Sequence, residues 1–135
     1  MIVPFCAPSG TGKTTFLIAL SSLLVKRNRT VAIAKSTHHE TLKEDSCKAD
    51  SYKYERLNIP FLISSNPEEL LLFVQNQPTD FVLVEGGRSL SMPSVVLKRG
   101  PFDPSWSPPH TVVRTIDIEK AEALHQTQAW LLSLV

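Results

Sequence analysis

The stretch CAPSGTGKTT, residues 6–15, limits the possible folds of this 135-residue chain more than any other segment. It nearly matches the phosphate-binding pattern G-x-x-x-x-G-K-[ST], with Gly12, Lys13 and Thr14 in register and alanine at the first glycine position. The apolar run IVPFCA precedes the loop, and a helical pattern over about 13–27 follows it. Because a phosphate-binding loop requires this order of strand, loop and helix, the sequence predicts a phosphate site here.

The predicted site combines backbone N–H groups with one cation and one hydroxyl. Gly10 and Gly12 let the backbone approach an anion, and N–H groups from Gly10 to Thr14 can form a nest at the start of the helix. Lys13 would contact the β- and γ-phosphates, and the Thr14 hydroxyl would complete the shell of a magnesium ion. Ala7 only turns the chain out of the strand, so alanine fits if its φ is negative. The candidate phosphate-binding residues are Gly10, Thr11, Gly12, Lys13, Thr14 and Thr15.

Apolar runs alternate with helical patterns along the chain, which favours a single α/β domain over residues 1–135. VAIA (31–34) and FVLV (81–84) are apolar at every position, as expected of strands covered by helices on both faces. Further strands are expected at 61–64, 95–97 and 112–116, and further helices in the fifties, at 67–75 and from about 118. The expected fold is a three-layer, doubly wound and mostly parallel sheet.

Two helix starts carry recognisable capping residues. Asn66 precedes Pro67, and Asp117 precedes Ile118. Side chains of this kind accept hydrogen bonds from the first N–H groups of a helix, so we expect helices to begin at 67 and at 118. The segment PFDPSWSPPH, 101–110, contains four prolines and is expected to be a surface loop without regular structure.

The composition gives no support to a nucleic-acid or membrane partner. A net charge of +1 and 20% charged residues leave any affinity for anions to a local site. The longest apolar stretch, FLIALSSLLV, has ten residues, which is short for a membrane span, and the first residues do not resemble a secretory signal. Cys6 and Cys47 lack C-x-x-C spacing. We therefore expect reduced thiols and a cytoplasmic protein.

Polar residues follow four of the expected strands, at the edge where open α/β sheets bind their ligands. Besides the phosphate loop, these are KSTHHE after VAIA, EGG after FVLV, and Lys98 with Arg99 after VVL. Glu85 follows FVLV directly, at a position where an acid can order magnesium or its water. Thr14 and Glu85 are therefore the candidate magnesium ligands, and Glu85 is also a candidate catalytic residue.

The adjacent histidines His38 and His39 lie beside the same predicted edge. In an extended chain they point in opposite directions and do not readily chelate one ion, and a zinc site with Cys47 would have no repeated ligand spacing. An imidazole can contact phosphate or water in either charge state near neutral pH. His38 is therefore the second candidate catalytic residue.

These segments resemble the MobB family of accessory proteins in molybdenum-cofactor guanine-dinucleotide synthesis. The resemblance rests on four segments that follow the family order over the first two-thirds of the chain: SGTGKTT (9–15), KSTHH (35–39), KADSY (48–52) and FVLVEGG (81–87). Family members usually carry histidine where this chain has Ser36. By position, the resemblance implies that Thr37, His38 and Asp50 are also site residues, and it adds Thr37 and Asp50 to the candidate cofactor-binding residues.

The resemblance implies a P-loop NTPase that binds GTP in preference to ATP, requires Mg²⁺ and hydrolyses GTP slowly at most. It also implies a homodimer and, as partners, a molybdopterin guanylyltransferase of the MobA type and the molybdenum cofactor. No [NT]-K-x-D motif is present to read guanine, so the choice of base comes from the resemblance alone. The alternative is a small-molecule kinase of the P-loop class that uses ATP, although no arginine-rich lid segment is visible.

Overall fold

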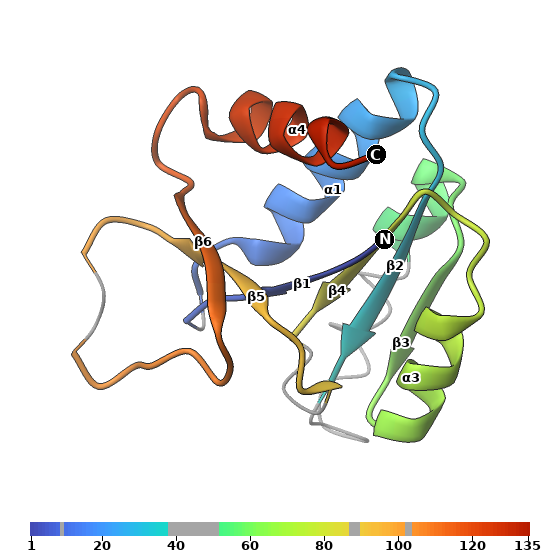
Figure 1. Ribbon diagram of the computed structural model, residues 1–135, viewed down its shortest axis with the longest axis horizontal. Helices are drawn as coiled ribbons and strands as arrows, with labels where there is room; N and C mark the ends of the chain where they lie inside the picture. The colour runs from blue at the N-terminus through green and yellow to red at the C-terminus, as the bar shows by residue number, and fades with distance from the viewer. Residues whose placement is uncertain (9, 38–51, 87–89, 102–103) are drawn as a thin grey trace.

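A computed structural model describes residues 1–8, 10–37, 52–86, 90–101 and 104–135 of the chain. In this part of the chain six strands form one parallel sheet in the order β3-β2-β4-β1-β5-β6 (Figure 1). The strands are β1 (Ile2–Cys6), β2 (Val31–Ser36), β3 (Phe61–Ser64), β4 (Phe81–Glu85), β5 (Ser94–Lys98) and β6 (Val112–Asp117). The helices are α1 (Lys13–Lys26), α3 (Pro67–Gln75) and α4 (Ala123–Ser133), and residues 52–57 form a further helical segment.

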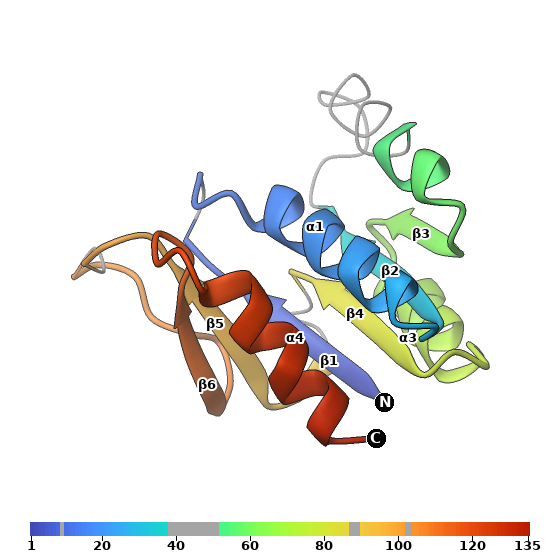
Figure 2. The ribbon, with the colours of Figure 1, turned by 90° about the horizontal axis from the view of Figure 1, so that it is seen from above.

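Helices cover both faces of the sheet, as the predicted doubly wound α/β fold requires. One face carries α1, α4 and the segment 52–57, while α3 packs on the opposite face (Figure 2). The alternation of side chains along β4 shows the division: Phe81 and Leu83 pack in the core under α1 and α4, whereas Val82 and Val84 pack against α3. The predicted fold class is therefore confirmed.

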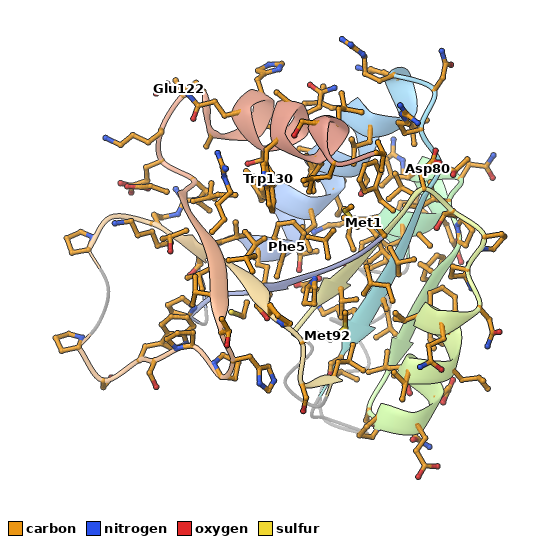
Figure 3. The ribbon with its side chains drawn as sticks, in the orientation of Figure 1. Met1, Phe5, Asp80, Met92, Glu122 and Trp130 are labelled. Carbon is orange, nitrogen blue, oxygen red and sulfur yellow. The ribbon has the colours of Figure 1, made fainter. Side chains whose placement is uncertain are left out.

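The core under α1 contains the largest buried side chains. Phe5 on β1 is fully buried and points into the interior between sheet and helices (Figure 3). Leu17, Leu20 and Leu24 of α1 are also fully buried, which fixes the rotation of this helix on the sheet. Because α1 begins at Lys13, inside the phosphate-binding pattern, its rigid packing fixes the position of the loop that follows β1.

Strand register brings the ends of three neighbouring strands together. Glu85 at the end of β4 pairs in register with Phe5 of β1 on one side and with Lys35 of β2 on the other. Parallel strands place their carboxyl ends at the same edge. The loop after β1, the residues after β2 and the acid at the end of β4 therefore share one site.

The two predicted helix starts have different outcomes. Asn66 caps α3 as predicted, since its side chain accepts hydrogen bonds from the N–H groups of Glu68 and Glu69. The prediction of a final helix from 118 is wrong, because α4 begins at Ala123. The backbone N–H of Ile118 donates to the carbonyl of Lys98 at 2.9 Å, and residues 118–119 form a turn directly after β6.

The side chain of Asp117 accepts the N–H of Glu119 at 3.1 Å, and its carbonyl accepts the N–H of Lys120. Asp117 thus closes a turn that lies between β6 and α4, and does not cap a helix.

The proline-rich segment 101–110 has no helix or strand in its described residues, as predicted. No helix in the described part of the chain is both long and apolar enough to cross a membrane.

Candidate nucleotide-phosphate site

The loop between β1 and α1 is held by its own hydrogen bonds. The Thr11 hydroxyl donates to the carbonyl of Pro8 at 2.6 Å, and the Thr11 N–H donates to the same oxygen at 3.3 Å. Gly10 and Gly12 adopt φ values of 80° and 97°, in the left-handed region that side chains disfavour. The two glycines therefore make the tight path of this loop possible.

The start of α1 has the features of an anion site. Its first α-helical bond runs from the N–H of Phe16 to the carbonyl of Gly12 at 3.0 Å. The Gly12 position supplies no side-chain cap, and the first turn contains no acidic residue. The positive end of the helix is therefore not compensated by its own side chains, and this favours a bound anion such as phosphate.

Ala7 does not disturb this loop. It is absent from the described residues that have a positive φ, so alanine meets no conformational penalty there. Its side chain packs, partly buried, against the core. The departure from the glycine pattern at this position is therefore compatible with the loop conformation.

Glu85 is the buried acid of the site and is contacted from three sides. The Thr14 hydroxyl donates to its Oε1, and the Tyr54 hydroxyl donates to its Oε2 at 3.0 Å. The ammonium of Lys35 lies 3.8 Å from Oε1. Glu85 itself is only 4% exposed. Buried carboxylate oxygens need hydrogen-bond donors, and these contacts also fix the orientation of the Glu85 side chain.

Gly86, the residue after this acid, has a backbone conformation that favours glycine. It has a φ of 75°, and its N–H donates to the carbonyl of Phe5 at 3.1 Å. A Cβ added here would lie 3.6 Å from the Ser36 carbonyl oxygen and 3.9 Å from the Lys13 ammonium nitrogen. The positive φ therefore favours glycine, and the Lys13 ammonium reaches across the loop to the end of β4.

All of the predicted phosphate-loop residues and the predicted acid line one open pocket of about 370 Å³. The described residues that line it are Pro8, Gly10, Thr11, Gly12, Lys13, Thr14, Thr15, Lys35 and Glu85. Two lysines and one glutamate leave a net positive lining, which suits a polyphosphate. The Thr14 hydroxyl and the Glu85 carboxylate also fit Mg²⁺, which binds through one or two such oxygens together with substrate phosphates.

The remaining predicted site residues are not placed in this pocket. Thr37 follows β2 and donates its N–H to the Ser64 carbonyl at 3.0 Å, and it is not among the described residues that line the pocket. His38 and Asp50 lie outside the described residues. The structure therefore brings together the phosphate and magnesium candidates, while roles for these three residues stay predictions.

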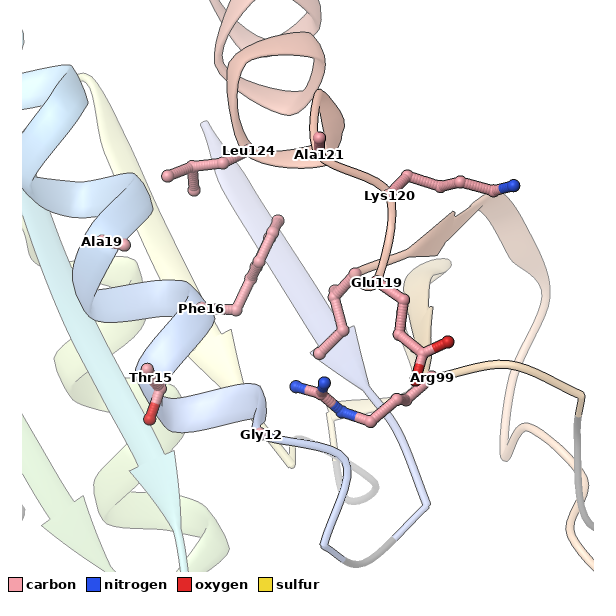
Figure 4. Close-up of a pocket in the computed structure, with 10 residues that line it drawn as sticks. Gly12, Thr15, Phe16, Ala19, Arg99, Glu119, Lys120, Ala121 and Leu124 are labelled. Atoms are coloured by element: carbon pink, nitrogen blue, oxygen red, sulfur yellow. The ribbon is translucent and has the colours of Figure 1, made fainter.

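A second pocket, of about 460 Å³, adjoins the first on the side of β5 and β6. Its lining includes Gly12 and Thr15, which also border the phosphate pocket, together with Phe16, Ala19, Leu124 and the loop residues Arg99, Glu119, Lys120 and Ala121 (Figure 4). Arg99 donates from Nε to the carbonyl of Thr11 at 3.1 Å and extends toward the phosphate loop (Figure 4). The two pockets thus form a continuous surface along the start of α1.

Asp117 joins the two loops that border the second pocket. Its Oδ1 accepts the N–H of Glu119 at 3.1 Å and that of Gly100 at 3.5 Å. The backbone donor of Glu119 is the main cause that holds the pKa of Asp117 below its ordinary value of 3.8, with further help from Gly100 and from the cations Lys98 and Lys120. The ionised carboxylate therefore ties the turn after β6 to the loop after β5.

Sequence reasoning assigned no role to Lys35 and Glu119, which line these pockets, or to Tyr54, which contacts Glu85. Lys35 is the first polar residue after VAIA, but its position beside Glu85 depends on β2 and β4 being neighbours, which the sequence does not specify. Tyr54 belongs to a helical segment in which an aromatic residue is typical of the core. Glu119 was expected inside the first turn of a helix, and only the turn before α4 places it at a pocket.

Comparison with known proteins agrees with this architecture. Residues 2–113 match the family model for MobB, molybdopterin guanine dinucleotide synthesis protein B. A molybdopterin-guanine dinucleotide biosynthesis adapter protein from Haemophilus influenzae is 28% identical over 106 residues. The match covers 67% of this chain and 59% of that protein, so the chain spans less than two-thirds of its relative. Because the family model covers most of the sequence, the chain belongs to the MobB family.

Proposed function

We propose that this protein is a GTP-binding accessory protein of molybdopterin guanine dinucleotide synthesis, which binds nucleotide triphosphate with Mg²⁺ and hydrolyses it slowly at most. The role in this biosynthesis follows the family description and the printed name of the relative, an adapter protein. Binding of the phosphates and of the metal is argued from the residues of the phosphate pocket.

The observation that carries the proposal is the contact between the Thr14 hydroxyl and the Glu85 carboxylate inside that pocket. One oxygen ligand comes from the start of α1 and the other from the end of β4, and both lie beside Lys13 in the pocket lining. Mg²⁺ would supply charge neutralisation for the phosphates when bound. Thr14 and Glu85 would hold it, and Lys13 would hold the β- and γ-phosphates.

The same contacts support slow turnover. Glu85 accepts hydrogen bonds from Thr14 and Tyr54 and lies near Lys35, so its carboxylate is already engaged and is poorly suited to take a proton from water. No other carboxylate or imidazole lines the phosphate pocket within the described ranges. Tight binding with little hydrolysis is what an accessory protein requires, whereas a kinase would need an acceptor and faster transfer.

The proposed partners are a second copy of the chain, a molybdopterin guanylyltransferase and the molybdenum cofactor. The printed word "adapter" in the name of the relative supports a partner enzyme. Light scattering of the purified protein tests the homodimer, and titration of a molybdopterin guanylyltransferase into the GTP-loaded protein tests the partnership. A monomer at all concentrations, or no heat of binding, would remove the corresponding part of the proposal.

Calorimetric titration with GTP and with ATP, each with and without Mg²⁺, tests the nucleotide-binding part. Lys13→Ala should abolish measurable triphosphate binding, because the loop would lose the cation that is proposed to hold the β- and γ-phosphates. Lys26→Ala is the matched control, since Lys26 is exposed in the last turn of the same helix. Equal affinity of Lys13→Ala and the parent would refute the phosphate site. Fast loss of the γ-phosphate only when a small metabolite is added would favour the kinase alternative.

A further inference from the structure

We propose that the second pocket, between the start of α1 and the turns after β5 and β6, binds the nucleobase, and that Glu119 makes it selective for guanine. This inference rests on the proposed function, because it presumes that a nucleotide occupies the phosphate pocket. It names a nucleobase-binding site and the residue that selects guanine there, in a chain that lacks the guanine-binding motif [NT]-K-x-D.

The position of the second pocket fits a nucleoside whose phosphates lie in the first. Gly12 and Thr15 border both pockets, so a ligand that leaves the phosphate loop on this side enters the second pocket directly. Its volume of about 460 Å³ is in the range of pockets that bind small organic ligands. The two pockets therefore suit the two ends of a single nucleotide.

The chemistry of the two pockets differs in the way a nucleotide requires. The first is lined by two lysines and polar loop residues. The second has an apolar wall formed by Phe16, Ala19, Ile118 and Leu124, contributed by α1 on one side and by the segment from β6 to α4 on the other. An aromatic base can pack against such a wall, whereas a phosphate group would lose its hydration there.

Arg99 lies at the junction between the two pockets. Its Nε donates to the Thr11 carbonyl, and its Nη2 lies 3.1 Å from the position that a Cβ on Gly12 would occupy. The guanidinium is therefore anchored to the phosphate loop from the side of β5 (Figure 4). A planar cation at this point can contact the α-phosphate or stack on the edge of the base.

Glu119 supplies the acceptor that distinguishes guanine. The guanine edge presents two neighbouring donors, N1–H and the 2-amino group, and a carboxylate can accept both. Adenine presents an acceptor at N1 on the corresponding edge, which a carboxylate repels. Within the described part of the chain, the Glu119 carboxylate has no hydrogen-bond or ion-pair partner, so it is available to a ligand.

Asp117, the other nearby acid, is not suited to this role. Its Oδ1 already accepts two backbone N–H groups, and it does not line the second pocket in the described residues. Its hydrogen bond to the N–H of Glu119 instead fixes the turn that presents Glu119. Of the two acids, Glu119 is therefore the one that can accept hydrogen bonds from the base.

Titration of GTP, ITP, ATP and inorganic tripolyphosphate, all with Mg²⁺, tests the inference. The parent should bind GTP more tightly than ATP by on the order of tenfold or more, the effect of a hydrogen bond to a charged group. ITP keeps N1–H but lacks the 2-amino group, so its affinity should be intermediate. Glu119→Gln should lower GTP affinity and raise ATP affinity, because an amide can both donate to adenine N1 and accept from its amino group.

Glu122→Gln is the matched control, since Glu122 is an exposed acid at the start of α4 and does not line the second pocket (Figure 3). A GTP-to-ATP ratio that is near one in the parent, or that Glu119→Gln leaves unchanged, overturns the base assignment. If tripolyphosphate binds in that case, the proposed phosphate site survives. Failure of every nucleotide and of tripolyphosphate to bind overturns the proposed function and this inference together.

Discussion

The hydroxyl of Tyr54 donates a hydrogen bond of 3.0 Å to Oε2 of Glu85, and the phenol is fully buried. The other carboxylate oxygen of Glu85 accepts the hydroxyl of Thr14 in the phosphate pocket. Tyr54 therefore orients the acid that, together with Thr14, is the proposed ligand of Mg²⁺. It acts through Glu85 and is a positioning residue, since it does not line the phosphate pocket in the described residues.

Replacing Tyr54 by phenylalanine removes this donor and keeps the ring. Stability should fall by about 1–3 kcal/mol, because one oxygen of a buried carboxylate loses its partner. The Mg²⁺ concentration required for half-maximal nucleotide binding should rise several-fold, while binding without Mg²⁺ should change little. Urea unfolding measures the first effect, and titrations at a series of Mg²⁺ concentrations measure the second.

Tyr52→Phe provides the control for this variant, since Tyr52 is 61% exposed on the same helical segment. It should leave both stability and Mg²⁺ dependence unchanged. A stability loss in Tyr54→Phe without any change in Mg²⁺ dependence would show that the hydroxyl matters only for the fold.

Asp117→Asn should make the protein less stable near neutral pH and remove part of its acid sensitivity. The pKa of Asp117 is lowered in the folded state, first by the N–H of Glu119, so ionisation stabilises the fold above the ordinary pKa of 3.8. This stabilisation is lost as the pH falls through the lower pKa of the folded protein. The parent and the variant should therefore differ in denaturant midpoint at about pH 7 and converge at about pH 2.

The amide of asparagine still accepts a hydrogen bond, so the comparison isolates the charge of Asp117. A gap between the two proteins that is as large in strong acid as at neutral pH would mean that the charge contributes nothing to stability.

Asn66→Ala should destabilise the protein by about 1 kcal/mol, because α3 loses the side chain that caps its first turn. Asn66→Ser keeps an acceptor and should recover most of this loss. Thermal unfolding of the three proteins checks the order. Equal melting temperatures for the alanine and serine variants would show that the hydrogen bonds to Glu68 and Glu69 are not the source of stability.

Local patterns were sufficient to predict most of the fold. The apolar runs VAIA and FVLV gave strands that are buried on both faces, and PEELLLFVQ matches α3 at both ends. The start of α4 was mispredicted because Asp117 was interpreted from its neighbours in sequence. Its actual partners include the N–H of Gly100, which is distant in the chain. A capping residue and a turn residue use the same chemistry, so only tertiary contacts distinguish them.

The candidate site was predictable where a motif or strand end defines it. The phosphate loop and Glu85 were found because a contiguous pattern and a strand end mark them, and the structure places them in one pocket. Lys35 and Tyr54 contact Glu85 through the order of the strands and the packing of the segment 52–57. Those relationships join residues far apart in the chain, and one sequence contains no direct record of them.

The magnesium dependence of GTP binding in Glu85→Gln tests the central claim most directly. In the parent, GTP affinity measured by calorimetry should rise strongly when Mg²⁺ is added, because Thr14 and Glu85 hold the metal against the phosphates. In Glu85→Gln, affinity without Mg²⁺ should be equal to or above that of the parent, and most of the gain on adding Mg²⁺ should be lost. The same gain in both proteins would contradict the assignment of Glu85 as the acid of a magnesium-triphosphate site.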